Sequence, residues 1–328
     1  MKMKNKRKKK GFTLVELLVV IAIIALLMSI LMPALARVRM YANRVFCGTN
    51  LSGIGKAMMI YANEDKYQEL PRPGFYDTTW ATDGIISDFA HEDREQAFAD
   101  GTATVTSALY LLIKYADGSA EQFVCPGDTA KEFEVSDSGS STTDAAELWD
   151  FGEDTTRPPG TFCSYAYQFP FSFNYNILRN YPLDTGSSSL MPVCADRNPY
   201  LDIQAKSYIE GADGDDETPD FAHNDLQDPD HTMNAASHGR EGQNVLKMDV
   251  SVQWCEKPNV GILNDNIYKY WPTNPGESPP GNEGRQFGDS QSPGDFVPLN
   301  QETFPRGTED AFLVSEINGD SSDLTSGG

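Results

Sequence analysis

Residues 11–36 read GFTLVELLVVIAIIALLMSILMPALA, and this stretch decides how the chain is organised. From Leu17 to Ala36 the only clearly polar side chain is Ser29. A helix of about 20 apolar residues matches the hydrocarbon thickness of a bilayer. The ten residues before it, MKMKNKRKKK, carry seven of the 26 Lys and Arg residues and no acid. Because Lys-rich flanks stay cytoplasmic, the sequence predicts a spanning helix with its N-terminus inside and the rest of the chain outside.

The charge of the remaining chain excludes one class of function. The 328 residues have a formal net charge of −22, but residues 11–328 hold only 19 basic residues against 48 acidic ones. Nucleic-acid binding depends on Lys and Arg displacing counterions from the phosphate backbone, so we expect no nucleic-acid partner. Hydrophobic residues make up 39% of the chain, which is enough for a packed core. The length allows one large domain or two small ones.

Three interpretations of the apolar segment compete. A secretory signal peptide needs small residues before its cleavage site, and Ala34-Leu35-Ala36 supplies them, but its apolar core is normally only about 7–15 residues long. A permanent anchor fits the length. It leaves Glu16 unexplained, because a carboxylate inside a spanning helix costs about 3 kcal/mol and usually marks function. The third interpretation accounts for Glu16 by a specific motif.

The string Gly11-Phe12-Thr13-Leu14-Val15-Glu16, between a basic leader and an apolar helix, resembles the type IV prepilin and pseudopilin family. The resemblance implies that a prepilin peptidase cuts between Gly11 and Phe12 and methylates the new N-terminus at Phe12. It also implies that other pilin or pseudopilin subunits and an inner-membrane assembly platform are partners. Glu16 then lies four residues beyond the new ammonium. It can meet that cation within its own helix or in the next subunit, and so neutralise two charges in an apolar filament core.

Pro33 lies near the end of the apolar run and removes one helical hydrogen bond. The family resemblance implies a bend or local melting of the helix at this depth. The alternative is a proline that the membrane helix simply tolerates.

Beyond residue 36 the pattern becomes amphipathic. Apolar residues recur at intervals of three and four, with one longer gap, at Val38, Tyr41, Val45, Leu51, Ile54, Met58 and Tyr61. This spacing predicts one helical face covered by a folded domain. Gly53 and Gly55 are unfavourable inside a helix, so we expect close packing there. The predicted segments are a removed leader (1–11), a membrane and filament-core helix (12–36), its amphipathic extension (37–63) and an exported acidic globular domain (64–328).

The globular domain is predicted to be α+β and pilin-like, with the long helix packed on an antiparallel sheet. Short runs rich in aromatic and β-branched residues alternate with turn residues, as in antiparallel strands. The predicted strands lie at 121–125, 162–167, 171–178, 244–254 and 311–314, and a helix is predicted at 107–116. Residues 128–157 and 211–220 are predicted to be solvated excursions, and about 272–328 to be loop-rich.

Six further segments resemble the long pseudopilins known as type II secretion G-type or H-X9-DG proteins. The three longest are 47–61 (CGTNLSGIGKAMMIY), 123–128 (FVCPGD) and 238–252 (HGREGQNVLKMDVSV), and the others are 163–167, 264–268 and 311–314. In those proteins Asp-Gly stands at the hairpin tip, a pair that suits a type I′ turn. Here Val250 follows Asp249, and a β-branched residue suits positive φ poorly. Either the turn type differs or the tip is shifted.

Two groups of side chains are candidate cation ligands. Three of the four histidines, His223, His231 and His238, lie among acidic residues and offer ligands for zinc or another divalent metal. Their spacing matches no recognised pattern, and a polar loop is the alternative. The second group offers oxygens for calcium but lacks the EF-hand glycine, and comprises Asp213, Asp215, Asp216 and Glu217. We expect no cofactor, with calcium as the open alternative.

The sequence predicts no enzyme. It contains no G-x-S-x-G elbow, H-E-x-x-H motif, P-loop or dinucleotide-binding glycine pattern. Ser237 next to His238 does not make a catalytic triad, because adjacency in sequence is not geometry.

All five cysteines follow the predicted membrane span and therefore meet an oxidising compartment. They are Cys47, Cys125, Cys163, Cys194 and Cys255. An odd number leaves at least one thiol unpaired, and five cysteines allow fifteen ways of forming two bridges. We expect one or two disulfides, and their pairing stays open.

Two functional hypotheses follow. In the first, the protein is a structural subunit of a type IV pilus-like filament, specifically a G-like type II secretion pseudopilin. It would be held in the inner membrane by a single span, with a cytoplasmic N-terminus and a periplasmic body, before it joins a filament. In the second, it is a membrane-tethered or surface-displayed binding module that uses the leader for export. The body is much longer than a minimal pilin head needs, which motivates the second hypothesis.

Overall fold

The computed structural model describes residues 14–74, 79–80, 94–98, 102–138, 144–152, 159–168, 170, 183–199, 234–268, 311 and 313–315. The chain forms two units, residues 1–42 and residues 43–328. A long N-terminal helix and a five-stranded antiparallel sheet give the predicted α+β, pilin-like class of fold.

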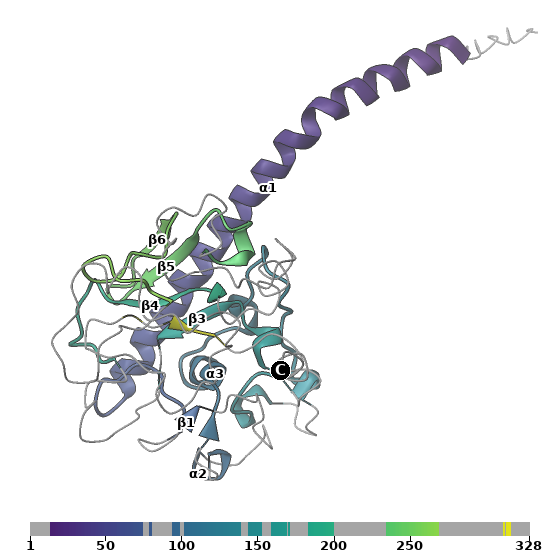
Figure 1. Cartoon of the computed structure of the whole chain (residues 1–328). Coiled ribbons are helices and arrows are strands. Elements are labelled where there is room, and N and C mark those ends of the chain that lie inside the picture. Colours follow the sequence, from purple (N-terminus) through teal and green to yellow (C-terminus); the bar gives the residue numbers. More distant parts are fainter. Residues whose placement is uncertain are drawn as a thin grey trace, which may run out of the picture. The chain divides into compact units, whose positions relative to one another are not determined.

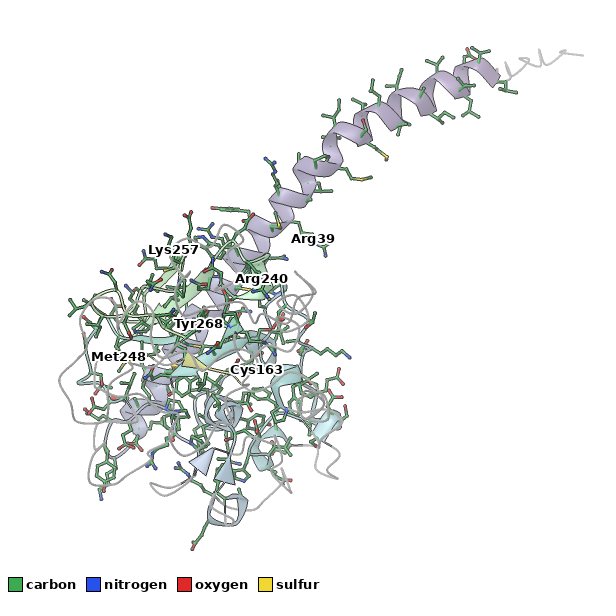
Figure 2. The ribbon with its side chains drawn as sticks, in the orientation of Figure 1. Arg39, Cys163, Arg240, Met248, Lys257 and Tyr268 are labelled. Carbon is green, nitrogen blue, oxygen red and sulfur yellow. A yellow bond between two sulfur atoms is a disulfide. The ribbon has the colours of Figure 1, made fainter. Side chains whose placement is uncertain are left out.

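The first helix, α1, runs from Leu14 to Glu64. It runs through Pro33 without a break. The bend or local melting that the family resemblance implies as subunits pack stays a prediction. One turn earlier, the Ser29 hydroxyl donates a hydrogen bond to the Leu26 carbonyl at 2.8 Å and so satisfies its own polar group within the helix. In the first unit the side chains from Leu14 to Met40 are exposed (Figure 2). By length and composition this helix can cross a membrane.

Within the second unit α1 buries one stripe of small and apolar side chains. Leu51, Ile54 and Met58 are fully buried, as their spacing predicts. Val45 is 51% exposed, so the predicted stripe was wrong at this end and begins at Cys47 instead. The Cys47 side chain is buried because its disulfide with Cys125 joins the helix to the globular domain.

The sheet has the strand order β6-β5-β4-β3-β7 (Figure 1). Its strands are β3 (Tyr165–Gln168), β4 (Pro192–Asp196), β5 (Gln243–Lys247), β6 (Val252–Cys255) and β7 (Leu313–Val314), and every neighbouring pair is antiparallel. A separate parallel pair joins β1 (Thr79–Trp80) to β2 (Thr102–Ala103). Four of the five strands of this sheet are fully or largely buried, and their buried residues include polar ones such as Asp196 and Gln243.

The structure confirms some of the predicted strands and contradicts others. Residues 244–254 form the β5–β6 hairpin, as predicted. The strand predicted at 162–167 begins only at Tyr165, and the one predicted at 311–314 is described only at Leu313–Val314. The prediction at 121–125 was wrong, because Ala120–Phe123 forms the 3₁₀ helix η1. Phe123 is nevertheless buried, so its apolar character reflects core packing and not a strand. The predicted strand at 171–178 lies outside the described residues.

The predicted helix at 107–116 is α3, Val105–Tyr115. Thr104 caps its N-terminus, where its hydroxyl accepts a hydrogen bond from the Ser107 N–H at 3.1 Å. A shorter helix, α2, spans Arg94–Ala97. Among the residues that the structure describes, further 3₁₀ turns are η2 (Val135–Ser138), η3 (Ala145–Glu147), η4 (Pro159–Phe162) and η6 (Ala236–His238).

The prediction of a solvated excursion at 128–157 was wrong at its buried aromatic residues, whereas described acidic residues such as Glu132, Glu134 and Glu147 are exposed. Phe151 is fully buried and packs edge-to-face on Tyr110 of α3 with ring centroids 5.0 Å apart, and on Phe133 at 5.7 Å. Trp149 is also buried. The abundance of Asp, Ser and Thr in this stretch masks a few aromatic residues that dominate its burial.

Asp150 lies within this aromatic region and is fully buried. It accepts hydrogen bonds from the Thr104 hydroxyl and from the Phe151 N–H, the latter at 2.8 Å. Burial raises the pKa of Asp150 to about 7, although these donors act in the opposite direction. The second predicted excursion, 211–220, lies outside the described residues.

The β5–β6 hairpin turns through Met248, Asp249 and Val250. The Val250 N–H donates to the Lys247 carbonyl at 2.9 Å, and the Lys247 N–H donates to the Ser251 carbonyl at 2.9 Å. Val250 has φ 65°. The connection is therefore a three-residue loop whose last residue is left-handed, a position that normally takes glycine. The turn type thus differs from I′, but a positive φ is retained despite the β-branched side chain.

Candidate functional site

The N-terminal motif supplies the first candidate site. Gly11 and Phe12 lie outside the described residues. Glu16 lies in the first turn of α1 among exposed apolar side chains such as Val15 and Leu17. A carboxylate in this turn interacts favourably with the positive end of the helix dipole. The local geometry therefore presents one acidic group at the N-terminal end of an otherwise apolar helical surface.

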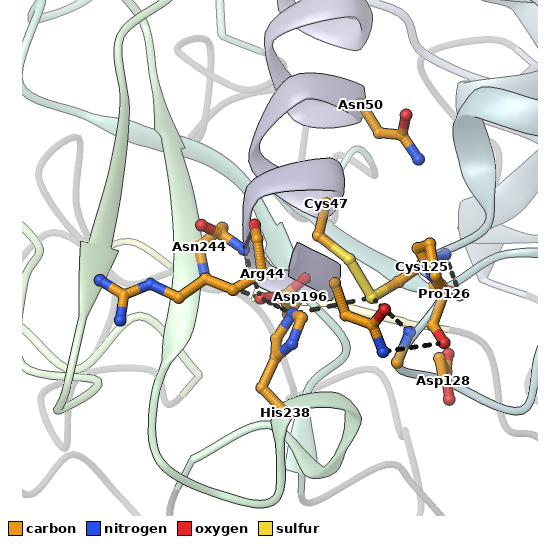
Figure 3. Close-up of a disulfide and its surroundings, with 12 residues drawn as sticks. Arg44, Cys47, Asn50, Cys125, Pro126, Asp128, Asp196, His238 and Asn244 are labelled. Carbon is orange, nitrogen blue, oxygen red and sulfur yellow. Dashed lines mark hydrogen bonds and ion pairs between the residues drawn. A yellow bond between two sulfur atoms is a disulfide. The ribbon is translucent and has the colours of Figure 1, made fainter. Parts of the chain in front are cut away.

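The second candidate site is built where the FVCPGD segment meets α1. Cys47 and Cys125 form a disulfide whose Cα atoms are 5.2 Å apart. On either side of it, Asn43 and Asn50 of α1 donate side-chain hydrogen bonds to the carbonyls of Pro126 (3.3 Å) and Val124 (2.9 Å). Figure 3 shows Asn50 on the helix that carries Cys47 of the disulfide. The segment is therefore held on the helix by one covalent bond and two polar contacts.

The end of the same segment is anchored in the body. Asp128 forms an ion pair with Arg197 at 3.1 Å, and both side chains are buried. Arg197 also donates to the carbonyls of Gly160 (2.9 Å) and Cys163 (2.6 Å). Removing one member of such a pair leaves a buried charge uncompensated, which costs about 3–5 kcal/mol.

His238 of η6 lies against the disulfide. Its Nε2 is 3.3 Å from Oδ2 of Asp196 and 3.6 Å from Sγ of Cys125. The imidazole also packs edge-to-face on Trp254 with centroids 5.5 Å apart. His238 is only 7% exposed and Asp196 is fully buried. We call Cys47, Cys125, Asp196 and His238 the disulfide cluster.

Neighbouring groups fix the orientation of the disulfide cluster. The Asn244 N–H of β5 donates to Oδ2 of Asp196 at 2.7 Å. The Asn244 side chain donates to the Arg44 carbonyl of α1 at 3.2 Å. The Arg44 guanidinium stacks over the Trp254 ring at 3.8 Å. The helix, the hairpin and the end of β4 thus converge on the same four side chains.

The structure brings together only some of the predicted site residues. His238 lies beside Asp196, a residue at the end of β4 that no sequence motif singled out. His223 and His231, which the sequence grouped with His238, lie outside the described residues. So do the calcium candidates Asp213, Asp215, Asp216 and Glu217. Asp196 was missed because a lone acid at the end of a strand carries no signal until the topology places it.

The remaining cysteines, Cys163, Cys194 and Cys255, are free and buried. Burial raises the pKa of Cys163 to about 12 and that of Cys255 to about 11, and it holds the pKa of Cys194 well above its ordinary value. All three are therefore protonated at neutral pH, and a thiol is a much weaker nucleophile than a thiolate. The structure thus forms one disulfide.

Comparison with protein families gives one match, a prokaryotic N-terminal methylation motif at residues 6–32. It covers Gly11, Phe12 and Glu16 together with most of the apolar run. The chain therefore carries the methylation motif and an apolar N-terminal helix. Both are consistent with a type IV prepilin or pseudopilin. The motif implies processing by prepilin peptidase and assembly with other pilin subunits. Comparisons with curated proteins and with solved structures find no match.

Proposed function

We propose that the mature chain is a structural subunit of a type II secretion pseudopilus, of the G-like kind, and that it is not an enzyme. Prepilin peptidase cuts between Gly11 and Phe12, and Phe12 becomes the methylated N-terminus. The observation that carries this proposal is the methylation motif followed directly by a helix in which Glu16 interrupts a wholly apolar surface.

The exposed apolar side chains of α1 are stable only when they are removed from water. Fully burying a Val, Leu, Ile or Met side chain is worth about 1.5–3 kcal/mol, and α1 exposes many of them from Leu14 to Leu35. In the precursor these side chains are buried in a bilayer, because the precursor is a single-pass inner-membrane protein with its body in the periplasm. In the filament they are buried against the helices of neighbouring subunits.

Glu16 fixes the position of one subunit's helix relative to that of its neighbour in the filament. A carboxylate in an apolar helical bundle is costly unless it meets a cation. Cleavage supplies that cation, because it creates a new ammonium at Phe12. The pairing is available only to processed subunits, so it couples cleavage to assembly.

The body supports assignment to the long secretion pseudopilins. Three of the segments that resemble them, 47–61, 123–128 and 238–252, converge on the disulfide cluster through Cys47, Cys125 and His238. A disulfide in this position fits folding in an oxidising compartment such as the periplasm.

Intact-mass analysis and N-terminal sequencing test the processing step. The chain is isolated from cells with and without prepilin peptidase, alongside a Gly11→Val variant that should retain its leader. The proposal predicts methyl-Phe12 as the first residue only when the peptidase is present. A terminus at Arg37 would indicate ordinary secretion, and an intact leader in peptidase-positive cells would indicate a permanent anchor.

A further inference from the structure

The disulfide cluster brings together four potential metal ligands from distant parts of the chain. The donor atoms of Cys47, Cys125, Asp196 and His238 all lie within 4.8 Å of one another, and all four residues are buried. They come from α1, the FVCPGD segment, the end of β4 and η6. Figure 3 shows the imidazole of His238 and the carboxylate of Asp196 facing the two sulfur atoms.

We propose that, when the Cys47–Cys125 disulfide is reduced, these four side chains bind one zinc ion. Two thiolates, one imidazole and one carboxylate form a four-coordinate set of the ligand types that zinc takes in proteins. Thiolates disfavour calcium and magnesium, which take oxygen ligands. The site therefore alternates between a covalent cross-link in the oxidised protein and a metal cross-link in the reduced protein.

Asp196 provides an independent reason to place a cation here. Its Oδ2 accepts the Asn244 N–H at 2.7 Å. Its Oδ1 is buried and has no hydrogen-bond partner among the described residues. A buried acceptor without a hydrogen-bond donor destabilises the folded state, and a bound cation would satisfy it.

His238 is oriented for coordination through Nε2. This nitrogen, and not Nδ1, is the one that faces both Asp196 and Cys125. Trp254 packs on the ring and Arg44 packs on Trp254, so the imidazole is held in place by neighbours that are not ligands themselves. Support of this kind fixes ligand orientation at metal sites.

Reduction requires only local movement. On a tetrahedral zinc with bonds of about 2.3 Å, two thiolates lie about 3.7 Å apart. The two sulfur atoms therefore move apart when the disulfide is reduced and zinc binds, and rotation of the two side chains can supply this movement because the Cα atoms are 5.2 Å apart.

The redox step balances with a dithiol as the reductant. The dithiol gives two electrons and two protons to the Cys47–Cys125 bond, becomes a disulfide itself and leaves two protein thiols. Zinc then binds both sulfur atoms as thiolates and displaces the two protons. Binding should therefore strengthen as pH rises, as for other thiolate sites.

The test compares zinc binding by the oxidised and the reduced full-length chain in detergent. We expect one additional zinc per reduced chain, measured by metal analysis after gel filtration. Cobalt substitution should give a thiolate-to-cobalt charge-transfer band and the intense d–d bands of a tetrahedral site. The substitutions Cys47→Ser, His238→Ala and Asp196→Asn should each lower the zinc affinity of the reduced chain at least tenfold, whereas Cys255→Ser, which lies outside the cluster, should not.

Folding of the reduced chain is followed by near-UV circular dichroism in the same samples. If reduction loosens the body, zinc should restore its signal, because metal binding and folding are coupled. Equal zinc content in both redox states would overturn the proposal. So would an unfolded reduced chain that zinc fails to restore, or unchanged zinc affinity in the His238→Ala and Asp196→Asn variants.

Discussion

Gly55 of α1 lies so close to Leu246 of β5 that a Cβ on the glycine would stand 2.8 Å from the Leu246 Cδ1. The same Cβ would lie 3.1 Å from Cγ1 of Val250 at the hairpin tip. Gly53 differs, because its nearest neighbour is the Gln122 side chain at 3.4 Å, an ordinary contact. Gly55 therefore marks a close approach of the helix to the hairpin, and Gly53 provides a matched comparison.

The Gly55→Ala substitution is expected to destabilise the body relative to Gly53→Ala. Both changes favour the helix by up to about 1 kcal/mol. Only Gly55→Ala also overpacks a buried contact, which costs about 1–3 kcal/mol. Urea unfolding of the full chain, followed by tryptophan fluorescence, measures the difference. Equal stabilities would contradict the close packing at Gly55.

Val250 holds a left-handed backbone, which costs a non-glycine residue about 1–2 kcal/mol. Its contact beside Gly55 offsets part of that cost. Both Val250→Ala and Val250→Gly lose the side-chain contact, but only the glycine variant also removes the backbone cost. We therefore expect Val250→Gly to be more stable than Val250→Ala by about 1 kcal/mol in the same unfolding assay. The reverse order would mean that the tip does not hold this conformation in solution.

Asp150 should make the body less stable as pH rises. Its pKa is about 7 when folded and about 3.9 when unfolded, so the folded state binds the extra proton between these values. The stabilisation is complete below pH 4 and is lost as pH rises through 7, with a total on the order of 4 kcal/mol.

In the Asp150→Asn variant the side chain at this position is uncharged at every pH. The variant should therefore lack the pH-dependent part of the unfolding free energy that the carboxyl contributes. Tyr110 and Cys163 interact electrostatically with Asp150, and each has a raised pKa, so both stay neutral throughout this range. The difference in unfolding free energy between the wild type and Asp150→Asn, measured from pH 4 to pH 8, isolates the carboxyl. A difference that does not change with pH would contradict the assignment.

The disulfide should contribute a large part of the stability of the body. Cys47 and Cys125 are 78 residues apart, and closing a loop of this length is worth about 4 kcal/mol in the chain-entropy model. With a chelator present to exclude metal, the Cys47→Ala/Cys125→Ala double variant should unfold at lower urea concentration than the oxidised wild type. A dithiol reductant should lower the wild-type midpoint and leave the double variant unchanged. If the reductant shifted the urea midpoint equally in both proteins, its effect would not come from the Cys47–Cys125 disulfide.

The features that are predictable from the sequence are local ones. The spacing of Leu51, Ile54 and Met58 identified the buried face of α1, and the apolar run at 107–116 identified α3. The motif at Gly11, Phe12 and Glu16 was recognisable because its residue types and offsets are themselves the signal.

What could not be predicted depends on contacts between distant residues. Phe151 and Trp149 were hidden in an acidic stretch, because composition averages over the few side chains that decide burial. The pairing of Cys47 with Cys125 and the placement of Asp196 beside His238 follow from how distant segments pack together and not from spacing. Val250 retains a left-handed conformation because packing and hairpin register override its local preference.

The most direct test of the central claim is the polymer yield of a Glu16→Gln variant. Glutamine keeps the size of the side chain but cannot neutralise the Phe12 ammonium. Our account predicts that the variant is still cleaved and methylated at Phe12, while filament yield falls at least tenfold and a Ser29→Ala control assembles normally. A membrane-tethered binding module would instead keep its function without Glu16. Undiminished polymer from correctly processed Glu16→Gln protein would contradict the account.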